Sequence, residues 1–184
     1  MKKICVLDIE TTGFSHDKDC ILEIGMVELN LETGEVKPLL DEVFRENKLS
    51  ARHHKAWIFE NGFMTLEEVR KAPLFENISD KVQDILLRYE YVSAWNSAFD
   101  MGFLLSRGFS ITNELPCPMK TSADWFGIKN KWGKTGKWAS VDEAWKHLFG
   151  EDTGYNEIHR GADDAAHEAK IMYELYKKKV IWQK

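Results

Sequence analysis

Three groups of acidic side chains, far apart along the chain, could together hold divalent metal ions. The first group is Asp8 and Glu10, which follow a short apolar run. Side chains two residues apart on a strand share a face, here the face that Ile4 and Val6 define as buried. Two like charges at that place need a raised pKa, a basic partner or a divalent cation with oxygen ligands. If the strand ends at Leu7 instead, both carboxylates are solvated.

Asp100 is the second acidic candidate, because it follows a short buried run that ends at Trp95. Open α/β sheets place their sites at the carboxyl ends of strands, which favours a functional role. The alternative is a helix capping box, in which Ser97 caps the helix and Asp100 bonds back to the amide of the cap residue. The segment is equally compatible with capping and with metal binding.

The third group is the pair Asp163 and Asp164 at the start of a predicted helix. Either acid could simply interact with the helix dipole. Helical periodicity separates them, because Asp164 aligns with the apolar residues Ile171 and Leu175, whereas Asp163 aligns with polar side chains. Asp164 is therefore the candidate ligand. His159 precedes this helix, and a pKa near neutrality would suit it as a general base, although a solitary histidine there is usually an ordinary surface residue.

The elements that must bring these groups together are predicted to be strands first, then alternating strands and helices. The predicted strands are residues 3–9, 20–30, 35–44 and 91–95, and the clearest helices are residues 99–107, 141–149 and 162–180. The first strand is apolar on both faces, which is typical of a central strand, and a short turn favours an antiparallel second and third strand. This order indicates an α/β fold with a mixed sheet flanked by helices.

Composition limits the classes of protein that remain. The 184 residues, 43% apolar and 30% charged, predict one domain over residues 1–184 with a sizeable core. A net charge of −5 argues against a general nucleic-acid coat protein or a basic membrane binder, but not against a nuclease. We expect a cytoplasmic protein, because no apolar run is long enough for a membrane span or a signal peptide. The three cysteines are too far apart in sequence for a metal or redox pair, so we expect reduced thiols.

The three acidic segments together resemble a known set of motifs. Residues 7–13 (Leu-Asp-Ile-Glu-Thr-Thr-Gly), 96–100 (Asn-Ser-Ala-Phe-Asp) and 159–164 (His-Arg-Gly-Ala-Asp-Asp) are similar to the three exonuclease motifs of the DEDD superfamily, in its histidine branch. That branch includes the proofreading subunit of bacterial replicative polymerase, ribonuclease T and oligoribonuclease. The resemblance spans residues 4 to 176, nearly the whole chain.

The resemblance implies a role for particular residues and a specific fold. It implies a ribonuclease H-like mixed five-stranded sheet, an antiparallel meander followed by parallel strands, flanked by helices. The implied metal ligands are Asp8, Glu10, Asp100 and Asp164, with His159 as general base. The implied contacts to the terminal nucleotide are Thr11, Thr12, Phe14, Asn96 and Phe99. Trp95, where relatives often have histidine, departs from the family pattern and is expected to affect substrate handling, whereas we interpret Glu23 as structural.

The implied activity is that of a metal-dependent 3′-to-5′ exonuclease acting on single-stranded nucleic acid, with DNA favoured. Two Mg²⁺ or Mn²⁺ ions are the expected cofactors, because oxygen ligands favour hard cations, and the expected products are nucleoside 5′-monophosphates. The implied setting is DNA repair or proofreading, with a DNA polymerase as partner. Two alternatives stay open: an exoribonuclease acting on RNA ends, and a catalytically silent nucleic-acid-binding or polymerase-associated module of the same fold.

One further segment could bind substrate. Residues 129–138 form a predicted loop in which lysines alternate with tryptophans, and phosphate pairing together with base stacking suits a single strand. The alternative is that the tryptophans belong to the core and the lysines are merely solvated.

Overall fold

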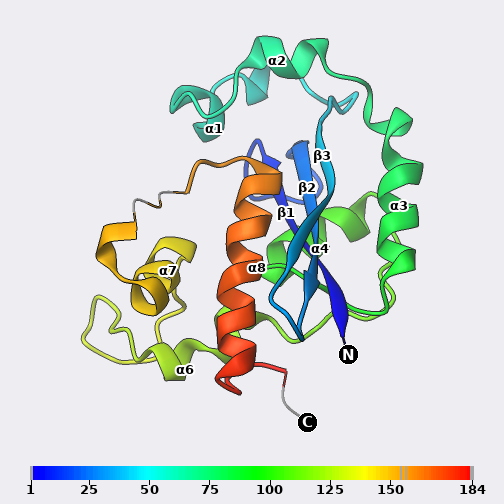
Figure 1. The fold of residues 1–184 in the computed structure, drawn as a ribbon. Coiled ribbons are helices and arrows are strands. Elements are labelled where there is room, and N and C mark those ends of the chain that lie inside the picture. Colours follow the sequence, from blue (N-terminus) through cyan, green and yellow to red (C-terminus); the bar gives the residue numbers. More distant parts are fainter. Residues whose placement is uncertain (1, 154, 156, 183–184) are drawn as a thin grey trace.

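The computed structural model describes residues 2–153, 155 and 157–182, and its centre is strand β1 (Lys3–Thr11). β1 pairs with the antiparallel strand β2 (Ile21–Asn30) and with the short parallel strand β4 (Val92–Ser93), and β2 pairs with β3 (Val36–Val43). The sheet order is therefore β3-β2-β1-β4. This is the mixed sheet expected from the sequence, with an antiparallel meander followed by a parallel strand (Figure 1).

The alternation along β1 separates two hydrophobic clusters. Ile4 and Val6 pack on one side with residues of α8 (Gly161–Lys177) and α7 (Val141–Phe149). Cys5, Leu7 and Ile9 point to the other side, where they pack with α3 (Ser79–Arg88) and α4 (Ser97–Ser106). β1 is thus covered on both faces, as its sequence predicts, and helices lie on both sides of the sheet (Figure 1).

A smaller lobe, defined here as residues 51–71, lies beyond one end of the sheet (Figure 1). It contains η1 (Ala51–His53), α1 (Trp57–Glu60) and α2 (Leu66–Lys71). Thr65 Oγ1 accepts the Glu68 amide N–H at 3.1 Å, the capping interaction that starts α2. The lobe has its own small cluster, which joins the start of β2 to α1 and α2 through Cys20, Leu22, Ala56, Ile58, Met64 and Val69.

The sheet has four strands in the part of the chain that the structure describes, one fewer than the five predicted. The missing strand is reduced to a single parallel bridge between Val92 and Glu114. Val92 N–H donates to Asn113 O, and Leu115 N–H donates to Val92 O, both at 3.0 Å. The ladder stops there because Pro116 follows directly, and proline has no N–H to donate.

The remaining elements are short. They are η2 (Phe75–Asn77), α5 (Pro118–Thr121), α6 (Ala123–Phe126) and η3 (Glu151–Thr153). Residues 129–138 form no helix or strand, as predicted. All three cysteines are free thiols, two of them buried. Within the described ranges, no helix is long and apolar enough to cross a bilayer.

Candidate active site

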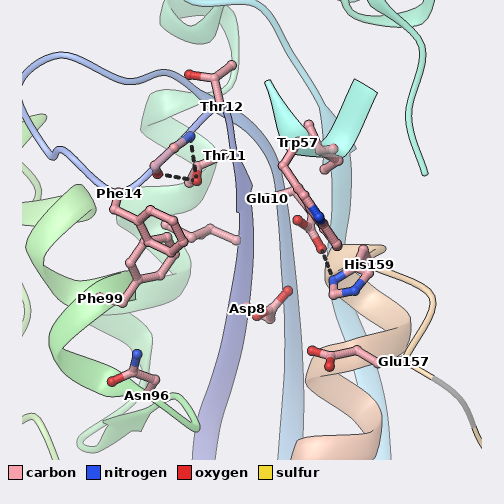
Figure 2. Close-up of a pocket in the computed structure, with 13 residues that line it drawn as sticks. Asp8, Glu10, Thr11, Thr12, Phe14, Trp57, Asn96, Phe99, Glu157 and His159 are labelled. Atoms are coloured by element: carbon pink, nitrogen blue, oxygen red, sulfur yellow. Dashed lines mark hydrogen bonds and ion pairs between the residues drawn. The ribbon is translucent and has the colours of Figure 1, made fainter. Parts of the chain in front are cut away.

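The site is a cleft of about 530 Å³ at the carboxyl end of β1. Figure 2 shows Asp8 and Glu10 between two walls, with Phe14 and Phe99 on one side and Trp57 on the other. β1 continues to Thr11, so both acids lie within the strand, and the alternative of a strand ending at Leu7 is wrong. Glu10 is only 9% exposed, and Asp8 is half-buried.

Asp100 approaches the site from α4 and is 4% exposed. The capping alternative for Asp100 is wrong, because Asn96 and not Ser97 precedes α4. Ser97 lies inside the helix, and its hydroxyl donates to Glu114 Oε1 at 2.7 Å. The carboxyl group of Asp100 is therefore not explained by a role at the helix start.

Asp164 approaches from the first turn of α8 and is 1% exposed, whereas Asp163 is exposed, as the helical phasing predicts. Asp164 Oδ2 accepts the Arg160 amide N–H at 2.9 Å, so one oxygen supports the start of the helix. The other oxygen, Oδ1, is buried without a hydrogen-bond partner among the described residues. Oδ2 therefore supports the start of the helix, whereas Oδ1 is the oxygen that could bind a metal ion.

The acidic side chains raise each other's pKa values. Burial raises the pKa of Glu10 to about 9, and the neighbouring charge of Asp164 adds to this effect. Burial raises the pKa of Asp100 to about 8 and that of Asp164 to about 6. The pKa of Asp8 is raised well above its usual value by burial and then by the charges of Glu168, Asp100, Glu10 and Asp164. Such a cluster is unfavourable unless positive charge offsets it.

The donor set fits divalent metal ions. Candidate ligand atoms of Glu10, Asp164 and His159 lie within 4.8 Å of one another. Asp100 Oδ1, like Asp164 Oδ1, is buried without a hydrogen-bond partner in the described part of the chain. Carboxylate oxygens are the ligands that hard cations such as Mg²⁺ and Mn²⁺ prefer. The residues present therefore suit the cofactor expected from the motifs.

His159 faces this cluster from the segment just before α8. Its Nδ1 lies 3.8 Å from Glu10 Oε1. Its backbone φ is +54°, a left-handed conformation that is unusual for a residue other than glycine and that marks local strain. Burial lowers the pKa of the imidazole, and the opposing effect of the Asp164 charge is smaller. The lowered pKa favours the neutral imidazole, the form that can accept a proton.

Two aromatic residues of the lobe region hold the His159 ring, and sequence reasoning missed both. The ring centroids of Trp57 and Phe63 lie 4.8 Å and 4.4 Å from that of His159, each in an edge-on geometry. Trp57 and Phe63 also stack on each other at 5.0 Å. This contact joins segments about 100 residues apart. The four-residue helix α1 is too short to show a periodicity that would predict it.

The residue next to His159 is anchored by two ion pairs. Arg160 Nε lies 2.9 Å from Glu23 Oε2, and Arg160 Nη2 lies 3.1 Å from Glu68 Oε1. Glu23 belongs to β2 and is buried, which raises its pKa to about 7 even though Arg160 lowers it. This pairing supports the interpretation of Glu23 as structural. It also ties the start of α8 to both the sheet and the lobe.

Two more acids lie near the cluster and were not singled out from the sequence. Glu168 is 4% exposed, and its Oε2 accepts the Trp95 amide N–H at 3.0 Å. It lies one helical turn after Asp164, so the phasing that selected Asp164 could also have found it. Glu157 lines the cleft beside His159 (Figure 2), and burial raises its pKa.

The residues expected to contact substrate all line the cleft: Thr11, Thr12, Phe14, Asn96 and Phe99. Phe14 is 89% exposed, and its ring centroid lies 6.1 Å from that of Phe99. Trp95 is 3% exposed and its Nε1–H donates to Ala139 O at 2.9 Å, so it is a core residue, and its expected effect on substrate handling stays a prediction. The 129–138 loop contributes no residue to the cleft lining.

Comparisons with known proteins agree with this geometry. The family model RNase_T, described as "Exonuclease", matches residues 5–172. The chain is 29% identical over 173 residues to a PolC-type DNA polymerase III of Clostridium perfringens, which covers 94% of this chain. The chain spans only 11% of the length of that polymerase.

Solved structures share the fold. The nuclease domain of 3′hExo, a DEDDh family member bound to rAMP, matches with a TM-score of 0.65 and 20% identity, covering 100% of this chain and 97% of that one. Exonuclease I of E. coli in complex with a dT13 oligonucleotide matches with a TM-score of 0.71 and 12% identity, covering 97% of this chain and 42% of that one.

Proposed function

This chain belongs to the exonuclease family of the DEDD superfamily, and from that premise we propose that it is a metal-dependent 3′-to-5′ exonuclease. Its substrate would be the 3′ end of single-stranded nucleic acid, with DNA favoured, and its products nucleoside 5′-monophosphates. We further propose that residues 1–184 form a single exonuclease domain. The likeness to a PolC-type DNA polymerase supports the preference for DNA and a proofreading or repair role beside a polymerase.

The observation that carries this proposal is the approach of Glu10, Asp164 and His159 to within 4.8 Å of one another beside an aromatic-walled cleft. These residues come from β1, from α8 and from the segment before α8, so only the folded chain brings them together. Asp8 and Asp100 add two more carboxylates to the same charged cluster. Such a cluster destabilises the metal-free fold, which favours a role for it in binding cations.

Asp8, Glu10, Asp100 and Asp164 are the residues that would hold two Mg²⁺ or Mn²⁺ ions. When bound, such ions supply the positive charge that binds and polarises the scissile phosphodiester. Asp8 lies between the two walls of the cleft (Figure 2), so a nucleotide held by those walls would present its phosphate near this carboxylate.

His159 would act as the general base. Its neutral ring would take a proton from water as the water oxygen bonds to phosphorus. The bond from phosphorus to the O3′ of the preceding nucleotide breaks, and that oxygen takes a proton from solvent. Trp57 and Phe63 would hold the imidazole in orientation, because they pack against its ring.

Phe14 and Phe99 would hold the terminal nucleotide. Their rings form one wall of the cleft, and exposed aromatic rings stack on nucleobases of any sequence. Phe14 is almost fully exposed, so a base can approach its ring without displacing protein side chains.

The proposal is tested with a 20-nucleotide strand that carries a label at its 5′ end, incubated with Mg²⁺ or with EDTA. We expect a ladder of products shortened one nucleotide at a time with Mg²⁺, no ladder with EDTA, and none for Asp8→Asn with either. A ladder from a 3′-blocked strand would contradict the stated polarity. Binding of the strand without shortening would contradict the enzyme and favour the silent module.

A parallel reaction with an RNA strand of the same sequence measures sugar preference. We expect kcat/KM to be higher for DNA. A higher value for RNA would make the chain an exoribonuclease with the same site and mechanism.

A further inference from the structure

Away from the cleft, residues 120–138 display tryptophans and lysines to solvent, and we call this surface the basic–aromatic patch. Trp125, Trp132 and Trp138 are 41%, 73% and 54% exposed. Lys131 Nζ lies 4.4 Å from the Trp132 ring centroid, and Lys120 Nζ lies 5.1 Å from that of Trp138. Exposure of three large indole rings on one short segment is unfavourable in water, so it favours a surface that binds something.

The tip of the patch is an ordered turn. Asn130 Oδ1 accepts the amide N–H groups of Trp132 and Lys134, at 2.9 Å and 3.1 Å. The Asn130 N–H donates to Lys134 O at 2.8 Å, and Gly133 has the positive φ of +78° that such a turn requires. The backbone therefore presents Trp132 in a fixed place, which lowers the entropy cost of using it as a contact.

The patch is basic within an acidic chain. Residues 120–138 contain five lysines and one aspartate, whereas the whole chain has a net charge of −5. Lys137 pairs with Glu143. The other lysines, at 120, 129, 131 and 134, form no ion pair with any residue in the described ranges. Their charge is therefore available to an anionic partner.

The patch begins near the carboxyl end of α8, and its last residues return toward the cleft. Asp164 is at the start of α8, whereas the segment after α8 contacts the residues leading into the patch, because Trp182 Nε1–H donates to Pro116 O at 2.9 Å. Figure 1 shows α6 beside the carboxyl end of α8. Ala139, the residue after the patch, accepts the Trp95 indole N–H at 2.9 Å, and Trp95 directly precedes Asn96 of the cleft lining.

We propose that the basic–aromatic patch is a second binding site for single-stranded nucleic acid, which holds the strand on the 5′ side of the nucleotides in the cleft. This inference rests on the proposed function. Lysines would pair with phosphates while Trp132 and Trp138 stack on bases, a combination that binds a strand without reading its sequence. The flat faces of the exposed indole rings favour a nucleic acid over an acidic protein, because bases of any sequence stack on such rings.

The position of the patch outside the cleft predicts a dependence on strand length. A strand whose 3′ end fills the cleft must continue beyond the cleft to contact the patch, and a stacked strand advances about 3.4 Å per nucleotide. A strand of four nucleotides, about 14 Å long at that spacing, has fewer nucleotides outside the cleft to contact the patch than a long strand has. Changes in the patch should therefore weaken binding of long strands more than binding of short ones.

The test compares two triple variants with the same change in charge. Lys129, Lys131 and Lys134→Ala removes patch charge, and Lys2, Lys37 and Lys81→Ala removes exposed charge elsewhere as a control. The dissociation constant for a labelled 30-nucleotide strand is measured by fluorescence anisotropy over a series of salt concentrations. We expect the patch variant to bind at least tenfold more weakly and to lose about two units of salt-dependence slope, at about 0.7 per lost contact. The control should change neither value.

Three further measurements distinguish a strand-binding patch from a general effect of lost charge or of damage to the cleft. Trp132→Ala should weaken binding of the long strand about tenfold. Replacement of the same three lysines by Arg should restore binding, since the charge is kept. The dissociation constant for a four-nucleotide strand should change much less in these variants than the dissociation constant for the long strand. An equal loss for short and long strands, or no loss for the long strand, would overturn the inference. Because binding is measured without turnover, the result holds even if the proposed activity fails.

Discussion

A single methyl group at Gly25 should disable the site without touching any proposed ligand. Gly25 lies on β2 opposite Asp8, where the first turn of α8 crosses the sheet. A Cβ at this position would lie 1.8 Å from Gly161 C and 2.0 Å from Ala162 N. Both contacts are with backbone atoms, so no side chain can rotate away to relieve them. The start of α8 must move instead.

The size of the movement follows from the geometry. Ordinary contact begins near 3.4 Å, so the separation must grow from 1.8 Å to 3.4 Å, a shift of roughly 1.6 Å. His159 and Asp164 lie two residues before and three residues after Gly161 and would move with it. A misplacement of about 1 Å can cost about 100-fold in rate, so kcat of Gly25→Ala should fall at least that far. Overpacking should also cost about 1–3 kcal/mol, or roughly 2–12 °C in Tm.

The assay measures kcat on the labelled strand at a temperature where the variant is fully folded, together with Tm. Gly108→Ala is the matched control. Gly108 has a φ of +86° with no atom within 4 Å of an added Cβ, so its substitution strains the backbone without moving α8. The control should lose stability and keep kcat. If Gly25→Ala retained kcat within twofold of the original chain, the close approach of α8 to β2 would not be what places the site.

Three other perturbations test separate parts of the site. Trp57→Ala should lower kcat about tenfold, and Trp57→Phe should lower it much less. In a His159→Ala background, Trp57→Ala should cause no further loss of kcat, whereas an equal loss in both backgrounds would mean that Trp57 does not act through His159. Asp164→Asn should weaken Mn²⁺ binding in calorimetry at least tenfold and Asp163→Asn less than twofold, so similar losses would refute the helical phasing. Burial raises the pKa of Asp164 to about 6 and of Glu10 to about 9, above the values near 4 in the unfolded chain. The metal-free folded state therefore binds more protons than the unfolded chain, and its Tm in EDTA should fall as the pH rises from about 4 to 9. A Tm that rises over that pH range would contradict these pKa shifts. Added Mn²⁺ should raise Tm most near pH 9.

The features that the sequence predicted well are those set by local periodicity. Alternation along β1 placed Asp8 and Glu10 on one face, and helical phasing separated Asp164 from Asp163. Both patterns depend only on the geometry of one element, so they could be derived without knowing its neighbours. The motif order then indicated that these elements meet.

The features that the sequence did not predict depend on contacts between distant segments. Trp57 reaches His159 across about 100 residues of chain, and nothing in either segment indicates the partner. The burial of Trp95 follows from its contacts with Ala139 and Phe126, which lie more than 30 residues further along the chain. The predicted fifth strand is only a single bridge between Val92 and Glu114, because Pro116 prevents further pairing. A resemblance at the level of the fold does not reveal the effect of one proline.

Each of the three hydrophobic clusters found among the described residues carries part of the site: Ile9 of one cluster and Ile58 of the lobe's cluster line the cleft, and α8, which bears Asp164, packs in the remaining cluster. Loss of any one cluster therefore dismantles the arrangement around His159 even while the other two persist. Loss of turnover in urea should consequently precede, and never lag behind, the disappearance of helical circular dichroism. Turnover would then detect the loss of a single cluster earlier than a circular dichroism signal averaged over the whole chain.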